Sequence, residues 1–246
     1  MSLPPILVAL ETSGPVGSVA LSADGVVLSR AFLGERGGHA AGLIPALDGV
    51  LQEAGVSRRA IGGIVVGGGP GSFTGVRVAA AAGKGLSHAL RVPLWAVSSF
   101  LAAVLTEEAL PGDAGPWGME PDSVGQHLHT RYILFDARGD RVFGAAYRLT
   151  DGVPVELRAP RFAHLAEILD DSELAGAGFC GDGAARHAVT LRDAGRLVLP
   201  PPLGFPSADG LLRALAVSPR LPPLVDPFAW EPEYLRASNA ERGRGA

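Results

Sequence analysis

The sequence predicts an α/β protein made of two tandem halves, each a mixed β-sheet flanked by helices. Three observations lead to this fold class. Short apolar runs of strand length alternate with longer segments of helical period. A pair of β-hairpins recurs after roughly 125 residues, which indicates an internal duplication. Each half reads β-β-β-α-β-α-β-α, and the second has shorter elements, so we expect it to be a reduced copy.

The first half begins with two hairpins and continues with alternating helices and strands. Asp24-Gly25 is typical of a two-residue hairpin turn. Apolar residues at helical spacing then predict a helix that ends at Gly55, with Pro45 in its first turn or at a kink. Ser98 is expected to cap a further helix that runs to about residue 110. Strands are predicted at residues 6–10, 17–22, 26–33, 61–66 and 92–97, and the helical stripe comprises Leu43, Leu47, Val50, Leu51 and Ala54.

The second half repeats this order. Asp151-Gly152 is again a hairpin turn, and aligning the two hairpins brings Glu11 opposite Asp136. A glycine turn at 181–183 opens a helix, and Ser207 is expected to cap the last one, which runs to about residue 217. Strands are predicted at 131–136, 141–149, 153–157, 177–180 and 196–199, and a helix at 162–169.

These elements divide the chain into four parts. We expect an N-terminal half at 1–110 and a reduced C-terminal half at 131–228. Residues 111–130 are rich in proline, glycine and acidic residues without periodicity, which is typical of a connector. Residues 229–246 form a C-terminal tail.

Composition narrows the functional classes. The net charge is −4 and the pI is near 5.9, which gives no argument for non-specific binding of nucleic acid by the whole protein. The single cysteine, Cys180, excludes an internal disulfide and fits a reducing compartment. The chain has no signal-peptide layout at its start and no run apolar enough to cross a bilayer. We therefore expect a soluble, cytoplasmic protein without membrane association.

Residues 67–90, "GGGPGSFTGVRVAAAAGKGLSHAL", follow a predicted strand and resemble a phosphate-binding loop. The P-loop pattern fails because Lys84 is followed by glycine and Val78 occupies the position of its first glycine. The dinucleotide pattern fails because Thr74 stands where its third glycine belongs. Two interpretations remain: an anion bound at the helix N-terminus, or a tight turn in which Ser72 or Thr74 caps the helix.

The helix after this loop carries unusually small side chains. Ala79, Ala82 and Gly83 recur at helical spacing and would let another backbone approach closely. Phe73 and Val76 would be apolar anchors, with Arg77 and Lys84 at the edge of this face. Packing inside the chain and contact with a partner both explain the pattern.

The duplicated order resembles the actin-like (ribonuclease H-like) superfamily of actin, sugar kinases and Hsp70. Its active members carry D-x-G-[ST] in the first turn, whereas this chain has Glu11-Thr12-Ser13-Gly14. The second turn has an arginine, Arg138, where phosphate would need the space of a glycine. Gly181 and Gly183 are a weak match to the adenosine-binding glycines. We therefore expect a vestigial nucleotide cleft at Glu11, Thr12, Asp136, Gly181 and Gly183, without a cofactor.

One branch fits better, because the sequence resembles the TsaB (YeaZ) family. The loop string matches the family signature G-x-G-P-G-S-F-T-G-[LV]-R. "ALETSGPVGSVAL", "FDARGDRVFGAAY", "PEYLR" at 232–236 and the residues around His39 match its other motifs in the correct order. The connector is longer than is usual for the family, and the tail after the last motif is not distinctive.

The resemblance implies a non-catalytic subunit of a tRNA-modifying complex. It would pair with the catalytic paralogue TsaD for threonylcarbamoyl transfer to N6 of adenosine 37 in tRNAs that read ANN codons. An ATPase of the TsaE type is a further partner, the chain would pair with itself when alone, and tRNA would be contacted only through the complex. The residues expected at the partner interface are His39, Leu43, Leu47, Phe73, Val76, Arg77, Ala79, Ala80, Gly83 and Lys84.

Enzymatic alternatives lack residues that they need. An actin-like kinase or ATPase is disfavoured by Glu11 and Arg138. A metallopeptidase of the glycoprotease type, or a metal site like that of the paralogue, needs H-x-x-x-H, and Leu43 replaces the second histidine after His39. His127 and His129 in the connector have no third ligand, so no metal is expected. Cys180 is expected to be a buried free cysteine without a neighbouring base.

Overall fold

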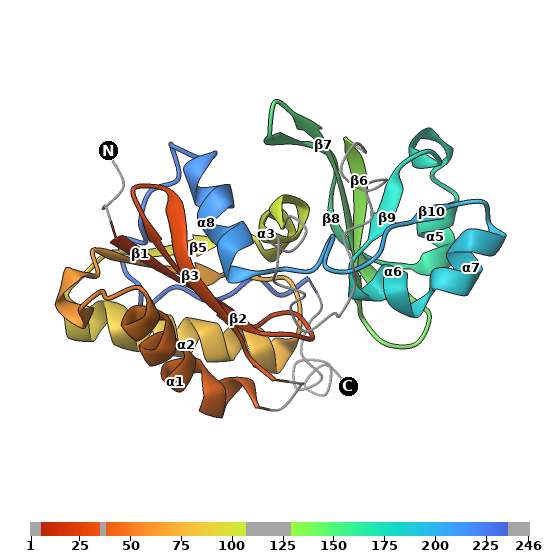
Figure 1. The fold of residues 1–246 in the computed structure, drawn as a ribbon. Helices are drawn as coiled ribbons and strands as arrows, with labels where there is room; N and C mark the ends of the chain where they lie inside the picture. Colours follow the sequence, from red (N-terminus) through yellow and green to blue (C-terminus); the bar gives the residue numbers. More distant parts are fainter. Residues whose placement is uncertain (1–5, 35–37, 107–128, 236–246) are drawn as a thin grey trace.

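The computed structural model describes residues 6–34, 38–106 and 129–235 (Figure 1). In these residues the chain forms two five-stranded mixed sheets, with strand orders β3-β2-β1-β4-β5 and β10-β9-β6-β7-β8. Read from β3 and from β8, the two orders are the same, because β6–β10 correspond in turn to β1–β5. The predicted duplication and the actin-like α/β fold class are therefore confirmed.

The first sheet contains the strands and helices that the hairpin pattern predicted. β1 pairs antiparallel with β2, so that Glu11 lies opposite Ser18, and parallel with β4. Asp24 and Gly25 both have positive φ, as a two-residue hairpin turn requires. Pro45 lies in the second turn of its helix, so of the two expected places, the first turn or a kink, the first turn is ruled out. The elements are β1 (Ile6–Glu11), β2 (Ser18–Ala23), β3 (Val26–Phe32), α1 (His39–Glu53), β4 (Gly63–Gly67), α2 (Phe73–Leu90), β5 (Leu94–Val97) and α3 (Ser99–Leu105).

The structure departs from the sequence prediction at two helix ends, one in each half. β8 runs on through Phe162, which pairs with Phe143 of β7, so the helix predicted at 162–169 begins only at Leu165. The predicted helix to residue 110 ends at Leu105. The elements are β6 (Thr130–Asp136), β7 (Arg141–Thr150), β8 (Val153–His164), α5 (Leu165–Leu169), β9 (Gly178–Cys180), α6 (Asp182–Arg186), α7 (Ala188–Asp193), β10 (Leu197–Val198) and α8 (Ala208–Ala216).

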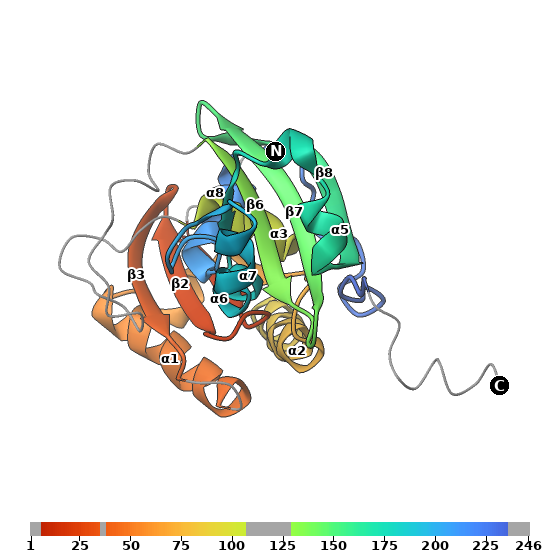
Figure 2. The ribbon, with the colours of Figure 1, turned by 90° about the vertical axis from the view of Figure 1, so that its right-hand side faces the viewer.

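The elements stack in layers because strand side chains alternate between two faces (Figures 1 and 2). In β1, Val8 and Leu10 point to a core shared with α1 and α2, whereas Leu7 and Ala9 point to a core shared with α3 and α8. The second sheet contributes its inner face to that same central core. Its outer face is covered by α5, α6 and α7.

The position of α8 was not foreseen. Although it follows the second sheet in sequence, α8 packs on β1, β2 and α3 of the first half. Ser18 of β2 accepts a hydrogen bond from the Ala208 amide at 2.9 Å. The predicted boundary at residue 228 stays a prediction, but the chain already returns to the first sheet at α8. Among the described residues, no helix combines the length and the apolar character that a membrane span needs.

Candidate functional site

The glycine-rich loop between β4 and α2 uses its backbone donors within the protein. The Gly68 amide donates to the Val97 carbonyl at 2.7 Å, and the Ser72 amide donates to the Ser13 carbonyl at 2.8 Å. Ser72 then caps α2, because its hydroxyl accepts from the Gly75 amide at 3.3 Å. Of the two interpretations of this loop, the capped tight turn is the one that the structure contains.

The loop and the start of α2 are rich in glycine because the turn between β1 and β2 packs directly against them. A Cβ on Gly71 would lie 2.7 Å from the Cβ of Ser13. A Cβ on Gly75 would overlap the Thr12 carbonyl oxygen. The Thr12 hydroxyl donates to the Gly75 carbonyl at 2.6 Å and accepts from the Ala79 amide at 3.1 Å. The first turn therefore binds α2 where an active superfamily member would bind phosphate.

Glu11, at the end of β1, is completely buried. Its carboxyl accepts from the Ser13 amide at 2.6 Å and from the Ser99 hydroxyl at 3.0 Å. Gly67 lies so close that a Cβ there would overlap the carboxyl oxygens. Burial raises the pKa of this carboxyl, although the hydrogen bonds act in the opposite direction. A carboxyl enclosed in this way has no open side from which to hold a metal–phosphate complex.

The second turn differs, because Arg138 is exposed and the Arg186 side chain is 52% exposed, although the Asp136 side chain is only 9% exposed. Asp136 accepts from the Arg138 amide at 2.8 Å, and its other oxygen lies 3.6 Å from a guanidinium nitrogen of Arg186. Gly181 and Gly183 face the backbone of β6: a Cβ on either would come within 3 Å of the Leu134 carbonyl oxygen. All five residues predicted for a vestigial nucleotide cleft are thus engaged in the chain's own packing, and the cleft itself stays a prediction.

The space between the two halves is filled by apolar side chains. Phe100 of α3 and Phe135 of β6 stack with ring centroids 4.5 Å apart and planes inclined by 7°. Both belong to a buried core that also contains residues of β1, β7 and α8. The predicted Glu11 and Asp136 turns are therefore separated by a packed core.

The predicted partner residues fall into two groups. Phe73, Arg77 and Lys84 are at least partly exposed, whereas the other seven are buried inside the chain. Gly83 shows why, because a Cβ there would overlap a methyl group of Val66 in β4. The small-residue face of α2 therefore packs on the sheet, and the contact of these side chains with a partner stays a prediction. The buried group comprises His39, Leu43, Leu47, Val76, Ala79, Ala80 and Gly83.

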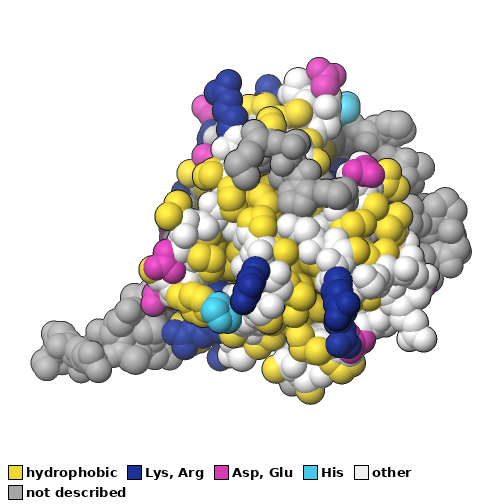
Figure 3. Space-filling model, turned by 90° about the vertical axis from the view of Figure 1, so that its left-hand side faces the viewer, with side chains coloured by type: hydrophobic (Ala, Val, Ile, Leu, Met, Phe, Trp, Pro, Cys, Tyr) yellow, Lys and Arg dark blue, Asp and Glu magenta, His cyan; other side chains and the backbone are white. Residues whose placement is uncertain are grey.

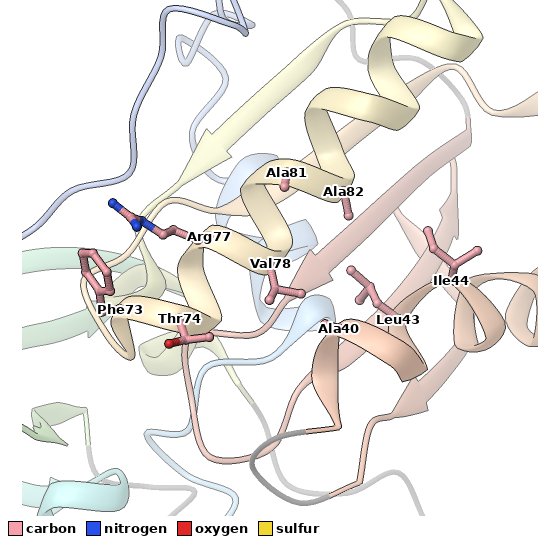
Figure 4. A pocket seen from close by; sticks show the side chains of 9 residues that line it. All are labelled: Ala40, Leu43, Ile44, Phe73, Thr74, Arg77, Val78, Ala81 and Ala82. Atoms are coloured by element: carbon pink, nitrogen blue, oxygen red, sulfur yellow. The ribbon is translucent and has the colours of Figure 1, made fainter.

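An apolar groove lies instead between the outer faces of α1 and α2 (Figure 4). Its volume is about 480 Å³. Two large apolar side chains stand exposed in its walls: Ile44 is 45% exposed and Phe73 is 43% exposed. Among the described residues, Arg77 is the one charged residue in the lining, which comprises Ala40, Leu43, Ile44, Phe73, Thr74, Arg77, Val78, Ala81 and Ala82.

Exposed apolar side chains occur on other faces of the protein as well. Figure 3 shows them spread over the end of the molecule that lies on the left in Figure 1. Such exposure is ordinary for a folded protein. The groove is distinguished by its concave shape and by the two neighbouring helices that contribute to it. A concave apolar strip between helices is the kind of surface that receives another helix.

The described residues contain no group of three histidine, cysteine or acidic side chains that could hold a metal ion. His39 is buried in α1, and its Nε2 accepts a hydrogen bond from the Gly17 amide at 3.1 Å. His127 lies outside the described residues. Burial raises the pKa of the Cys180 thiol to about 12, so this thiol stays protonated at neutral pH and is not activated as a nucleophile.

Comparison with known proteins supports the signature in the loop. Residues 35–119 match the family model of TsaD, tRNA N6-adenosine threonylcarbamoyltransferase. A TsaB protein of tRNA threonylcarbamoyladenosine biosynthesis from Bacillus subtilis is 25% identical over 67% of this chain and 64% of its own length, slightly less than two thirds. The structure of YeaZ from Pseudomonas aeruginosa superposes with a TM-score of 0.72, at 26% identity over 94% of this chain and 99% of that one.

In sequence and in fold, this chain is similar to the TsaB (YeaZ) proteins. A second TsaB protein, from Escherichia coli, is 34% identical over 39% of this chain and 41% of its own length. A Mycobacterium tuberculosis protein of uncharacterised function is 27% identical over 96% of this chain and 93% of its own length. This similarity agrees with the actin-like fold and with the signature between β4 and α2.

The sequence prediction missed most of the groove lining. The sequence did contain a signal for the lining. Once the large apolar residues identify the buried face of a helix, the residues on the opposite side form its exposed face. In α1 that exposed face carries Ala40 and Ile44, and in α2 it carries Thr74, Val78 and Ala81. What the sequence lacked was any indication of which stripe of α2 faces the sheet, because both of its stripes are made of small residues.

Proposed function

We propose that this TsaB-like chain is a non-catalytic subunit in the synthesis of tRNA threonylcarbamoyladenosine. In this role it pairs with a TsaD-type protein, which transfers the threonylcarbamoyl group to N6 of adenosine 37 in tRNAs that read ANN codons. A TsaE-type ATPase joins the same assembly. The chain contacts tRNA only through the complex and acts in the cytoplasm, where tRNA is modified.

The enclosed first turn supports the absence of catalysis by this chain. Phosphate chemistry in the superfamily needs an open carboxylate and free backbone donors at the turn between β1 and β2. Here Glu11 is completely buried, and Thr12 is hydrogen-bonded to α2. In the second turn, Arg138 stands where the sequence resemblance implies a glycine in active members.

The observation that carries the proposal is the apolar groove between α1 and α2. Both helices lie within residues 35–119, the segment that matches the TsaD family model. A TsaD-type protein is therefore expected to carry an equivalent pair of helices, and two similar surfaces can pack about a pseudo-two-fold axis. By the same argument, two copies of this chain pair through the same surface when no TsaD-type protein is present.

The test is to mix the purified chain with the TsaD-type protein of the same organism and to measure mass by light scattering. Ala81→Arg places a charge in the groove on an exposed helical position. Ala80→Arg would be a poor probe because Ala80 is buried. Ala216→Arg is the matched control, since Ala216 is also exposed in a helix but lies on the other face of the sheet.

We expect a complex with the wild type and with Ala216→Arg, and none with Ala81→Arg. A complex that survives Ala81→Arg would place the contact elsewhere and contradict the groove as the interface. If the wild type forms no complex and the isolated chain hydrolyses ATP, the scaffold proposal fails and an active actin-like ATPase takes its place.

A further inference from the structure

The segment 224–235, which we call the C-terminal strap, binds across the glycine-rich loop. The Leu224 amide donates to the Leu94 carbonyl of β5 at 2.8 Å, so the strap begins at the outer edge of the first sheet. The Glu233 amide donates to the Gly68 carbonyl at 2.8 Å. A Cβ on Gly69 would lie 2.8 Å from the Glu233 carbonyl oxygen. Part of the glycine-rich loop, whose sequence resembles a phosphate-binding loop, therefore packs against the strap.

The strap is also held by α2. The Lys84 ammonium donates to the Trp230 carbonyl at 2.6 Å and lies 3.4 Å from the Phe228 carbonyl oxygen. The ring of His88 meets the ring of Phe228 edge-on, with centroids 5.4 Å apart. Lys84 was expected to contact a partner, but its charge serves this internal contact. The strap thus follows α2 toward its first turn.

At that first turn the strap fixes the orientation of Arg77. The guanidinium carbon lies 3.9 Å from the centroid of the Phe73 ring. The Nε of Arg77 donates to the Tyr234 hydroxyl at 3.1 Å, and the rings of Phe73 and Tyr234 lie 5.2 Å apart. A stacked ring and a hydrogen bond together hold an arginine that stands at the surface (Figure 4).

The guanidinium keeps unused hydrogen-bonding capacity. Its Nε is bound to Tyr234, whereas no carboxylate of the described residues forms an ion pair with its two terminal nitrogens. Of the residues that the structure describes, Arg77 is the one charged residue that lines the groove. Exposed arginine side chains are normally flexible, and fixing one costs conformational entropy. An arginine that is already fixed loses less entropy when it binds, which favours recognition by its planar edge.

We propose that Arg77, held by Phe73 and the strap residue Tyr234, binds a carboxylate of an aspartate or glutamate on the partner that occupies the groove. The inference rests on the proposed function and adds the chemistry that selects the partner. The terminal nitrogens of a guanidinium match the two oxygens of a carboxylate, and the pairing is directional. Arginine beside exposed aromatic rings is also the composition that dominates binding energy in protein interfaces. Tyr234 acts as a positioning residue for this contact.

A double-mutant cycle tests the pairing, with the dissociation constant for the TsaD-type protein measured by titration calorimetry. We expect Arg77→Ala to weaken binding about 30-fold or more, as removal of an interface hot spot does. Arg77→Lys keeps the positive charge but loses the two parallel N–H donors of the guanidinium, and should still weaken binding about 10-fold. Tyr234→Phe keeps the ring and loses the hydroxyl, and should weaken binding about 3- to 10-fold.

The cycle separates positioning from direct contact. If Tyr234 acts through Arg77, then adding Tyr234→Phe to Arg77→Ala should change the affinity by less than about twofold. Arg148→Ala, at an exposed position of β7 away from the groove, is the control and should leave affinity unchanged. A Tyr234→Phe effect of equal size in both backgrounds, or an Arg77→Ala variant that binds like the wild type, would overturn the inference.

A second measurement uses the isolated chain and needs no partner. Proton exchange at the Arg77 Nε, followed by NMR, should be slower than at the exposed Arg148 and should become faster in Tyr234→Phe. Equal exchange rates would show that the arginine is not held and would refute the inference on their own. If the wild-type chain fails to bind the TsaD-type protein at all, the proposed function falls, and the carboxylate contact falls with it.

Discussion

The two halves of this protein carry the same strand order but use the same turn in opposite ways. In the first half the turn after β1 is buried, and Thr12 hydrogen-bonds the backbone of α2. In the second half the turn after β6 lies near the surface, where Asp136 faces the guanidinium of Arg186. The sequence resemblance implies that both turns correspond to the phosphate-binding turns of active superfamily members, which stays a prediction.

The difference shows that turns at equivalent places in two similar halves can be packed very differently, one in the core and one at the surface. Packing in the core requires close approach of two backbones, and glycine is the residue that allows it. Gly71 and Gly75 meet that requirement in the first half, whereas a Cβ on Gly139 in the second turn would meet open space. Substitutions in the first turn should therefore cost far more stability than substitutions in the second.

The largest effect is expected for Gly75→Ala. A Cβ at this position would overlap the Thr12 carbonyl oxygen, so α2 and the first turn must move apart. We expect the free energy of unfolding to fall by roughly 3 kcal/mol or more, measured by urea denaturation. Gly49→Ala is the control, because Gly49 lies in α1 with open space at the Cβ position. It should raise stability by about 0.5–1 kcal/mol.

Gly139→Ala tests the second turn in the same way, by the stability that is lost when a glycine gains a Cβ. Gly139 has φ +68°, so alanine would be strained although it meets no atom within 4 Å. We expect a cost of roughly 1–2 kcal/mol, the usual penalty for a left-handed residue other than glycine. A cost equal to that of Gly75→Ala would mean that both turns are equally constrained, and the contrast between the halves would be lost.

Thr12→Val removes the hydroxyl that joins the first turn to α2. The Gly75 carbonyl loses one of its partners, and the buried apolar methyl cannot replace it. We expect a loss of about 1–3 kcal/mol in denaturant unfolding, the cost of a broken buried hydrogen bond. Thr150→Val, at an exposed strand position of the second half, should change stability by less than about 0.5 kcal/mol. Equal losses for the two variants would contradict the structural role of Thr12.

The buried carboxyl of Glu11 predicts a dependence on pH that Glu11→Gln should remove. Burial raises its pKa in the folded state, so the folded chain keeps a proton that the unfolded chain has released. This contribution to stability is complete below the ordinary glutamate pKa and is lost as pH rises through the raised value. The expected slope in that window is roughly 1.4 kcal/mol per pH unit. Unfolding of wild type and Glu11→Gln at several pH values gives the difference, and a slope of opposite sign would mean that Glu11 is ionised in the fold.

Much of the fold could be predicted because its signals are local. The turns Asp24-Gly25 and Asp151-Gly152 need only two residues with positive φ, and their repetition revealed the duplication. The helix predicted at Phe162 failed for a non-local reason, since β8 is extended there by its pairing with β7. The position of α8 likewise depends on contacts with strands almost 200 residues earlier, such as Ser18 with Ala208, separated by 190 residues.

The candidate site shows the same limit. The signature pointed to α2, one of the two helices that line the groove, but the sequence did not indicate that Ala79 and Gly83 face the sheet while Ala81 faces outward. The strap contacts join Arg77 to a residue 157 positions later, and Lys84 to one 146 positions later. No period or spacing links residues so far apart, so the clamp on Arg77 became visible only in three dimensions.

The smallest effect is expected in the second turn, from Arg186→Ala. Its guanidinium lies 3.6 Å from an Asp136 oxygen, but the Arg186 side chain is 52% exposed, so water screens the pair. We expect a loss of about 0.2–1 kcal/mol by urea denaturation, decreasing further in high salt. A loss above about 2 kcal/mol, insensitive to salt, would indicate a charge pair as deeply integrated as the first turn. The turn of the second half would then also be packed into the core. The two halves would differ only in the residues that hold their turns in place.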